Sequence, residues 1–349
     1  MKKLTLLTLA LCLAAAAANR AAAANYTARR TTRDGVEVVV LTDAARKAEV
    51  TIVPSMGNMG YEMKVNGKNV LNTPDGSLAE FNAKGGMCGI PFLWPYANRI
   101  DQDAYYVNGK KYIFNPNLGN LGRDQNKNPI HGLVRTFPWS VVTVKADGQA
   151  AEVTSRLEYW KYPDLMAQFP FAHTIDMTYR LKDGVLEVET AIHNLATEPM
   201  PVAAGFHSIY KVNDAPFDDW KIHLGARDWL VLSPLLIPTG ETKQMPSPDP
   251  LPLKGVRFDD VFTNMIRGAD GRGEFWIQGK VEKVSVIYGP KYDVAVVVAR
   301  PGGSSVVMES MAAITNAFNL ANAGIYKKLQ MIPPGGEWRE SFWVRTTGF

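Results

Sequence analysis

Four Asn-Gly or Asp-Gly pairs constrain the fold of this chain more than any other local feature. The pairs are Asn66-Gly67, Asn108-Gly109, Asp147-Gly148 and Asp183-Gly184, and each separates two runs rich in β-branched or aromatic residues. Asn, Asp and Gly accept the positive φ angles of the tight turns that join antiparallel strands. The four pairs therefore predict hairpins and a mostly antiparallel, all-β protein.

The predicted strands are short runs of high β propensity spread along the chain. They cover residues 36–41, 48–53, 105–107, 110–114, 151–158, 174–181, 185–192, 281–288, 294–299 and 338–344. The best helical candidate, residues 315–330, contains several asparagines and Gly324, which favour irregular backbone. No repeat of fixed period is evident in the sequence, so a propeller or solenoid is not favoured.

Three long segments rich in Gly, Pro and Asn predict loops, at residues 82–104, 115–135 and 233–256. Loops of this length in a compact β protein are usually functional or disordered. These segments keep aromatic residues, so we expect ordered loops around a site. No shift in composition marks a linker, and residues 25–349 are predicted to form one domain.

Residues 1–24 have the pattern of a secretory signal peptide, with lysines at positions 2 and 3 followed by an uncharged run over 4–18. The run is shorter than the ~20 residues of a membrane span. Cleavage is expected near Ala24, with Ala18 as the alternative. We therefore expect an exported protein, periplasmic or extracellular, with no membrane segment in its mature form.

Removal of these residues lowers the formal charge from +4 to +1, because three basic and no acidic residues are lost. No Lys/Arg block remains, so nucleic acid is not an expected partner. The mature chain keeps Cys88 as its single cysteine and has no internal disulfide. Cys12 follows Leu11, which is too large for lipoprotein processing, so lipidation is not expected.

Glu309 is the most informative single residue, since it follows the apolar run Val306-Val307-Met308. An acid at the end of a doubly buried strand suggests a carboxylate held inside a site, where burial raises its pKa. The alternative is a strand-end carboxylate that points into water.

The histidines fall into two groups. His131 lies in a turn bracketed by Pro129 and Gly132, and His207 follows the small residues 203–205, which allow close backbone approach. Both are candidates for a site or for a structural hydrogen bond. The other three, His173, His193 and His223, lie in strand-like segments, and this pattern predicts a surface or core-edge role for them.

Asn98-Arg99 follows a Pro-stiffened aromatic segment, residues 91–97. The Arg99 guanidinium could donate to substrate hydroxyls or pin a loop by a salt bridge. Asp259 and Asp260 are candidate acceptors, although an Asp pair in a loop is also typical of a turn or cap.

Five segments together resemble, in this order, the aldose 1-epimerase (galactose mutarotase) family. The segments are Pro95-Tyr96-Ala97-Asn98-Arg99-Ile100, Asn128-Pro129-Ile130-His131-Gly132, Gly205-Phe206-His207-Ser208-Ile209-Tyr210, Phe258-Asp259-Asp260-Val261-Phe262 and Glu309-Ser310-Met311-Ala312-Ala313-Ile314-Thr315-Asn316-Ala317-Phe318-Asn319. The resemblance extends from about residue 35 to the C-terminus and includes Phe169-Pro170-Phe171 and the closing Pro-Gly-Gly-Glu337.

The resemblance implies a large, mostly antiparallel β-sandwich, the galactose mutarotase-like supersandwich, with a sugar cleft across one face. By the same resemblance, Glu309 would be the general base and His207, with a pKa near its usual 6.5, the general acid. The ligands of the sugar would be Asn98, Arg99, His131 and Asp259. The implied activity is interconversion of the anomers of a free aldose such as galactose or glucose, with no cofactor and no metal.

The sequence departs from the family pattern at Ser310 and at Ser208-Ile209-Tyr210, which neighbour the acid and base and put the substrate preference in doubt. The choice between Asp259 and Asp260, the oligomeric state and the identity of the aldose stay open. Trp94 or Phe318 could face the sugar ring, although a core role is favoured for both.

Rival interpretations use the same residues. His131, His207 and Glu309 could form a metal site with two histidines and one carboxylate. Glu309 with Asp259 could serve as a glycosidase pair. The fold could also be a non-catalytic carbohydrate-binding protein, or an epimerase of a hexose phosphate, for which the sequence reveals no cationic phosphate pocket.

Overall fold

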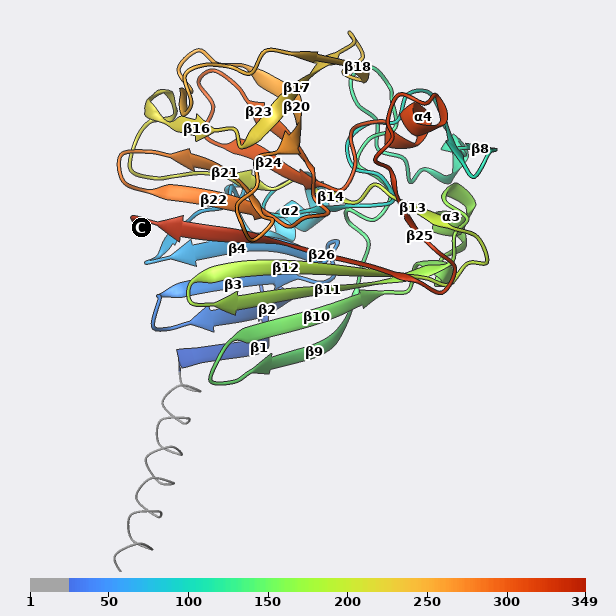
Figure 1. The fold of residues 1–349 in the computed structure, drawn as a ribbon. Coiled ribbons are helices and arrows are strands. Elements are labelled where there is room, and N and C mark those ends of the chain that lie inside the picture. Colours follow the sequence, from blue (N-terminus) through green and yellow to red (C-terminus); the bar gives the residue numbers. More distant parts are fainter. Residues whose placement is uncertain (1–24) are drawn as a thin grey trace, which may run out of the picture.

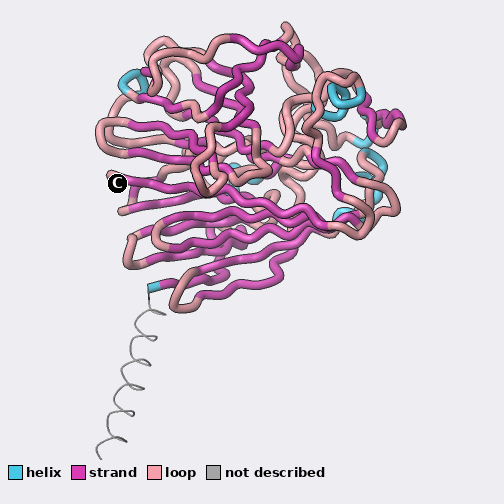
Figure 2. The backbone as a smooth tube through the Cα atoms, viewed as in Figure 1, coloured by secondary structure: helices cyan, strands magenta, loops and turns pink. Residues whose placement is uncertain are grey.

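The computed structural model describes residues 25–349, and the predicted signal peptide, residues 1–24, lies outside the described residues. Strands dominate the described part, and they form three large sheets and two small ones (Figures 1 and 2). Among the described helices, none is both long and apolar enough to span a membrane.

The largest sheet has nine strands. In spatial order they are β19 (Leu251–Pro252), β16 (Lys221–His223), β21 (Gly273–Gln278), β22 (Lys283–Tyr288), β26 (Glu337–Thr347), β12 (Val185–Asn194), β11 (His173–Lys182), β10 (Ala151–Leu157) and β9 (Ser140–Ala146). Neighbouring strands are antiparallel along the whole sheet. This sheet forms one layer of the molecule (Figure 1).

Two further sheets form the facing layer. The eight-stranded sheet contains β18 (Pro238–Lys243), β17 (Ala226–Leu232), β20 (Phe258–Met265), β23 (Val294–Ala299), β24 (Val306–Met311), β14 (Gly205–Phe206) and β6 (Phe92–Leu93), and β15 (Ile209–Tyr210) also pairs with β24. The five-stranded sheet contains β1 (Tyr26–Arg33), β2 (Val36–Asp43), β3 (Ala48–Val53), β4 (Met59–Val65) and β5 (Lys68–Asn69).

Smaller elements complete the described chain. The two-stranded sheets are β7 (Ala104–Val107) with β8 (Lys110–Ile113), and β13 (Met200–Val202) with β25 (Gln330–Ile332). The α-helices are α2 (Leu78–Lys84), α3 (Pro163–Gln168) and α4 (Ala317–Asn322), and 3-10 turns lie at Pro116–Leu118, Tyr159–Lys161 and Phe217–Asp219. Within the predicted helical segment 315–330 only α4 is α-helical, as its asparagines indicated.

One continuous core joins the layers. The ring of Phe206, in the eight-stranded sheet, lies 4.8 Å from that of Phe342 in the nine-stranded sheet. The hydroxyl of Tyr179, in β11, donates to the carbonyl of Asn58 and accepts from the amide of Gly60 at the five-stranded sheet. The predicted antiparallel β-sandwich is therefore confirmed, while the one-domain assignment stays a prediction.

All four predicted turns join paired strands, namely β4–β5, β7–β8, β9–β10 and β11–β12. At Asn66-Gly67, Asn108-Gly109 and Asp183-Gly184 both residues have positive φ, as the turn type requires. The Asp147 turn differs, because its carboxylate accepts from the amides of Gln149 and Ala150 and closes a longer loop.

Trp94 and Phe318 are 0% and 1% exposed and belong to the core, so neither faces a sugar. The indole of Trp94 donates to Nε2 of His173 at 2.8 Å, and His173 is itself fully buried. The prediction of a surface or core-edge role for His173 was therefore wrong. Its alternating strand pattern placed it on the inner face, where Trp94 and the carbonyl of Phe171 satisfy both ring nitrogens.

Candidate active site

Glu309 lies inside β24 rather than at its end, because the strand continues to Met311. Every residue of β24 is buried, and most of β23 beside it is buried as well. The side chain of Glu309 is 1% exposed, which confirms the expectation of a carboxylate held inside the protein. Its position opposite Val296 places it on the floor of a cavity, beside apolar neighbours.

His207 lies in the short gap between β14 and β15, where pairing with β24 is interrupted. Its amide donates to the carbonyl of Pro91 at 3.0 Å, which holds the backbone in place. Nε2 of His207 lies 3.8 Å from Oε1 of Glu309. Gly205, two residues before His207, must be small, because a Cβ at this position would come within 2.6 Å of the Ala97 Cβ.

Asn98, Arg99 and His131 come from two long loops that are tied together. The amide of His131 donates to the carbonyl of Asn98 at 2.9 Å, and Arg99 forms an isolated antiparallel bridge with Ile130. Asn98 and His131 both have left-handed backbone, with φ of 56° and 64°. This conformation is uncommon for residues with a Cβ and often marks a functional site. The His131 ring lies 5.0 Å from that of His207, nearly perpendicular to it.

Arg99 is held by two carboxylates. Its Nε donates to Oδ2 of Asp124 at 2.8 Å, its Nη1 donates to Oδ1 of Asn98 at 3.0 Å, and its Nη2 lies 3.5 Å from Oδ2 of Asp259. Sequence reasoning missed Asp124, although it lies in the 115–135 loop predicted to border a site. The salt bridge that pins the loop is therefore present, and Arg99 also lines the cavity. Its donation to substrate hydroxyls stays a prediction.

The structure separates Asp259 from Asp260. Asp259 lines the cavity, whereas the carboxylate of Asp260 accepts from the indole of Trp229 at 2.7 Å and from Lys243 at 3.1 Å. The carboxylate of Asp260 is therefore already bound to side chains of the neighbouring strands. Asp259 is the acid available to a ligand.

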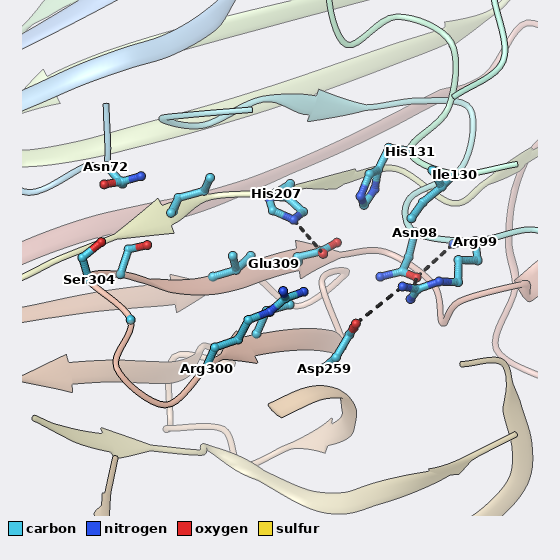
Figure 3. Close-up of a pocket in the computed structure, with 15 residues that line it drawn as sticks. Asn72, Asn98, Arg99, Ile130, His131, His207, Asp259, Arg300, Ser304 and Glu309 are labelled. Atoms are coloured by element: carbon cyan, nitrogen blue, oxygen red, sulfur yellow. Dashed lines mark hydrogen bonds and ion pairs between the residues drawn. The ribbon is translucent and has the colours of Figure 1, made fainter. Parts of the chain in front are cut away.

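All six predicted site residues line one cavity of about 480 Å³ (Figure 3). They are Asn98, Arg99, His131, His207, Asp259 and Glu309. Four polar lining residues were missed by sequence reasoning, namely Asn72, Arg300, Ser304 and Ser305. No motif singles them out, because three lie in the short connection between β23 and β24 and the fourth follows β5.

The floor of the cavity is aliphatic. Val298, Val307 and Ile209 follow one another across β23, β24 and β15, and Asp259 continues the same row on β20. Among the described residues that line the cavity there is no Phe, Tyr or Trp side chain. An apolar ligand face would therefore rest on branched aliphatic groups.

Burial shifts the two central groups in opposite directions. It raises the pKa of Glu309 to about 8, with the charge of Asp259 adding to the rise and Arg99 opposing it. Burial lowers the pKa of His207 to about 4, and the nearby Arg135 lowers it further. The expectation of a His207 pKa near 6.5 was therefore wrong, because the ring is buried more completely than a loop position suggested.

His131 behaves like His207. Burial lowers its pKa well below 6.5, and the neighbouring His207, Arg135 and Arg99 act in the same direction. Within residues 25–349, Nδ1 of both histidines and Oε2 of Glu309 are buried without a hydrogen-bond partner. Buried polar atoms are normally paired, so three unpaired atoms in one cavity indicate a place for a polar ligand.

In the part of the chain that the structure describes, no three or more His, Cys, Asp and Glu side chains are grouped so as to hold a metal ion.

Known proteins resemble this chain in sequence pattern and in fold. The family model of aldose 1-epimerase matches residues 39–344. The fold is similar to a galactose mutarotase-like protein from Clostridium acetobutylicum, with 19% identity, a TM-score of 0.83 and coverage of 93% of this chain and 99% of that one. It is also similar to galactose 1-epimerase from Lactobacillus acidophilus, with 12% identity, a TM-score of 0.69 and coverage of 93% and 99%.

An aldose epimerase homologue from C. elegans has a similar fold, with 15% identity, a TM-score of 0.65 and coverage of 86% of this chain and 96% of that one. At these low sequence identities, the similarity to the solved structures shows a shared fold and no more. The family model, in contrast, spans nearly all of the described chain, from β2 to β26. This chain belongs to the aldose 1-epimerase family.

Proposed function

We propose that this protein is an aldose 1-epimerase that interconverts the α and β anomers of a free aldose such as galactose or glucose. The observation that carries the proposal is the pair of buried Glu309 and partly buried His207, 3.8 Å apart in a cavity large enough for a sugar. Glu309 acts as the general base and His207 as the general acid. Family membership supports the same reaction class.

The separation of the pair suits this reaction. The C1 hydroxyl oxygen and the ring oxygen O5 are bonded to the same carbon, so a base for one and an acid for the other must lie side by side. Glu309 takes the proton of the C1 hydroxyl while His207 protonates O5, and the C1–O5 bond breaks to give an aldehyde. Rotation about C1–C2 and closure by the reverse transfers give the other anomer.

The pKa shifts describe where the proton rests. With the Glu309 pKa near 8 and the His207 pKa near 4, the pair holds one proton at pH 7, and it lies on Glu309. Ring opening starts with the proton on His207, which gives it to O5, and ends with a proton on Glu309, taken from the C1 hydroxyl. The protonation state of the free site is therefore the one that accompanies the open-chain intermediate. For the ring to open, the hydroxyls of the bound sugar must help to ionise Glu309.

The remaining residues bind and orient the sugar. Arg99, Asn98, His131 and Asp259 lie at one end of the cavity (Figure 3). A buried hydroxyl without a partner costs about 1–3 kcal/mol, so these donors and acceptors select sugars whose hydroxyls match them. The aliphatic floor receives the apolar face of the ring.

Polarimetry on freshly dissolved α-D-galactose and α-D-glucose tests the proposal. We expect the purified protein to accelerate equilibration well above the buffer rate, with aryl glycosides left intact. Xylose and arabinose complete the panel. The proposal is wrong if no aldose equilibrates faster than in buffer, or if glycosides are cleaved instead.

The rate should be nearly independent of pH between about 4 and about 8. The neutral pair and the ion pair contain the same single proton, so kcat/KM changes only when the pair gains a second proton below the His207 pKa or loses its proton above the Glu309 pKa. Saturation-transfer NMR across this range gives the profile. A maximum confined to a single pH unit near 6.5 would contradict it.

We also propose export of the protein, with residues 1–24 removed, on the strength of its sequence pattern. N-terminal sequencing of protein recovered from the periplasm or medium tests this. Recovery of the uncleaved chain from the cytoplasm would argue against export.

A further inference from the structure

The cavity contains a second arginine whose charge is not neutralised by an acid. Arg300 follows β23, and its side chain extends along the cavity toward Glu309 (Figure 3). Arg300 is exposed at the mouth of the cavity, and among residues 25–349 no ion pair or side-chain hydrogen bond engages its guanidinium. Arg99, in contrast, is held by Asp124 and Asp259. Arg300 is thus the cation of the cavity that is free to meet an anionic ligand.

Neutral donors gather at the same part of the cavity. Ser304 and Ser305 belong to the connection between β23 and β24 and line the cavity. Asn72 and Ser304 lie at the end of the cavity away from Arg99 (Figure 3). No hydrogen bond is made by these three side chains within the described residues. One cation with hydroxyl and amide donors is the composition of a site for a single small anionic group.

The position of this donor set can be related to the ring of a bound pyranose. When the hydroxyls of C2 and C3 lie at the Arg99 end, O5 and C5 form the opposite edge of the ring. O1 then lies at Glu309 and O5 at His207, as the proposed reaction requires. The substituent of C5, which is C6, lies on this same edge and points toward Arg300, Ser304 and Ser305.

We propose that Arg300, with Ser304 and Ser305, binds a carboxylate at C6, so that the preferred substrate is a hexuronic acid rather than the neutral hexose. The inference rests on the proposed function of the site. A guanidinium matches a carboxylate with two parallel hydrogen bonds. The single free cation equals the single charge of a carboxylate, whereas a phosphate ester carries about −1.5 to −2 at pH 7.

The test compares D-galacturonate with D-galactose, and D-glucuronate with D-glucose, by NMR measurement of anomer exchange. The wild type should have a kcat/KM for the acid at least about 10-fold above that for the matching hexose. In Arg300→Gln this ratio should fall by about 10- to 100-fold. Arg29→Gln removes the same charge from an exposed position on β1 and should keep the wild-type ratio. An unchanged ratio in Arg300→Gln overturns the inference.

A binding measurement separates this inference from the proposed reaction. Calorimetric titration of Glu309→Gln with galacturonate and with its uncharged methyl ester needs no turnover, and the acid should bind at least about 10-fold more tightly. Tighter binding of the acid together with no anomer exchange on any aldose would uphold the anion site and reject the epimerase. Equal binding of acid and ester in a protein that anomerises hexoses would reject the anion site alone. Tighter binding of galactose 6-phosphate than of galacturonate would also overturn the carboxylate assignment.

Discussion

Replacement of Glu309 by Gln is expected to lower kcat for aldose anomerisation by about 10²- to 10⁴-fold. Glutamine has nearly the same shape and can donate and accept hydrogen bonds, but it cannot take a proton from the C1 hydroxyl. Polarimetry under saturating aldose measures the loss directly. A variant that keeps more than about a tenth of the wild-type kcat would show that Glu309 is not the base.

The same substitution should make the protein more stable. The pKa of Glu309 is raised from 4.5 to about 8, so between these values the folded state retains a proton that the unfolded state releases. Wild-type stability therefore falls as the pH rises through this window, whereas the glutamine variant lacks this dependence. At pH 7 the expected gain is on the order of 3 kcal/mol, and thermal denaturation at pH 5 and pH 8 reveals its pH dependence.

Glu282 offers a matched control. It is also fully buried, but its carboxylate accepts from Lys68 and from the amide of Asn213. Glu282→Gln should therefore lower the stability of the fold, because Lys68 would lose its counterion. Glu282 lies outside the cavity, so the substitution should not affect the site directly. A loss of stability in Glu309→Gln like that in Glu282→Gln would mean that Glu309 is a structural acid.

Replacement of His207 by Gln is the second change with a large expected effect. The amide can still donate toward O5, but it cannot transfer a proton, so kcat should fall by about 10²- to 10⁴-fold. The acid limb of the pH profile should move from near pH 4 to near pH 8, because without His207 the single proton stays on Glu309 and only ionised Glu309 can act as the base. The pH dependence of kcat/KM separates this role from simple positioning, which would leave the acid limb in place.

The stability of this variant has the opposite pH dependence to that of Glu309→Gln. The His207 pKa is lowered from 6.5 to about 4, so below pH 6.5 the unfolded state binds a proton that the folded state does not. The wild type thus loses stability as the pH falls from 6.5 to 4, and His207→Gln should lose less. His193→Gln, a change at a partly exposed histidine between Asp176 and Glu337, serves as the control for both readouts.

Local sequence was sufficient for ten of the strands and for six residues of the cavity, but it missed strands such as β17 and β20, and the predicted loop 233–256 contains β18 and β19. The Asn-Gly and Asp-Gly pairs predicted the hairpins because the positive φ of such turns is a property of two residues and needs no tertiary context. Asn98, Arg99, His131, His207, Asp259 and Glu309 could be named because each lies in a short segment that resembles a family motif. All six line one cavity.

Other features could not be read from local sequence. Asp124 became visible only when the 115–135 loop was seen to bring it to the Nε of Arg99. Arg300, Ser304 and Ser305 occupy an ordinary polar connection between two strands, and their place in the cavity follows from strand register. The burial of His173 depended on which face of β11 met the other layer, and alternation alone does not choose between the faces.

By itself, then, the sequence determined many of the antiparallel strands, four of their turns and the chemical types at the site, because turn geometry and side-chain chemistry are local. Only the tertiary structure decided the proton affinities of that site. A carboxylate and an imidazole have ordinary pKa values in water, and it is the exclusion of water by the two packed layers that raises one and lowers the other. Desolvation of this kind depends on segments far apart in the chain.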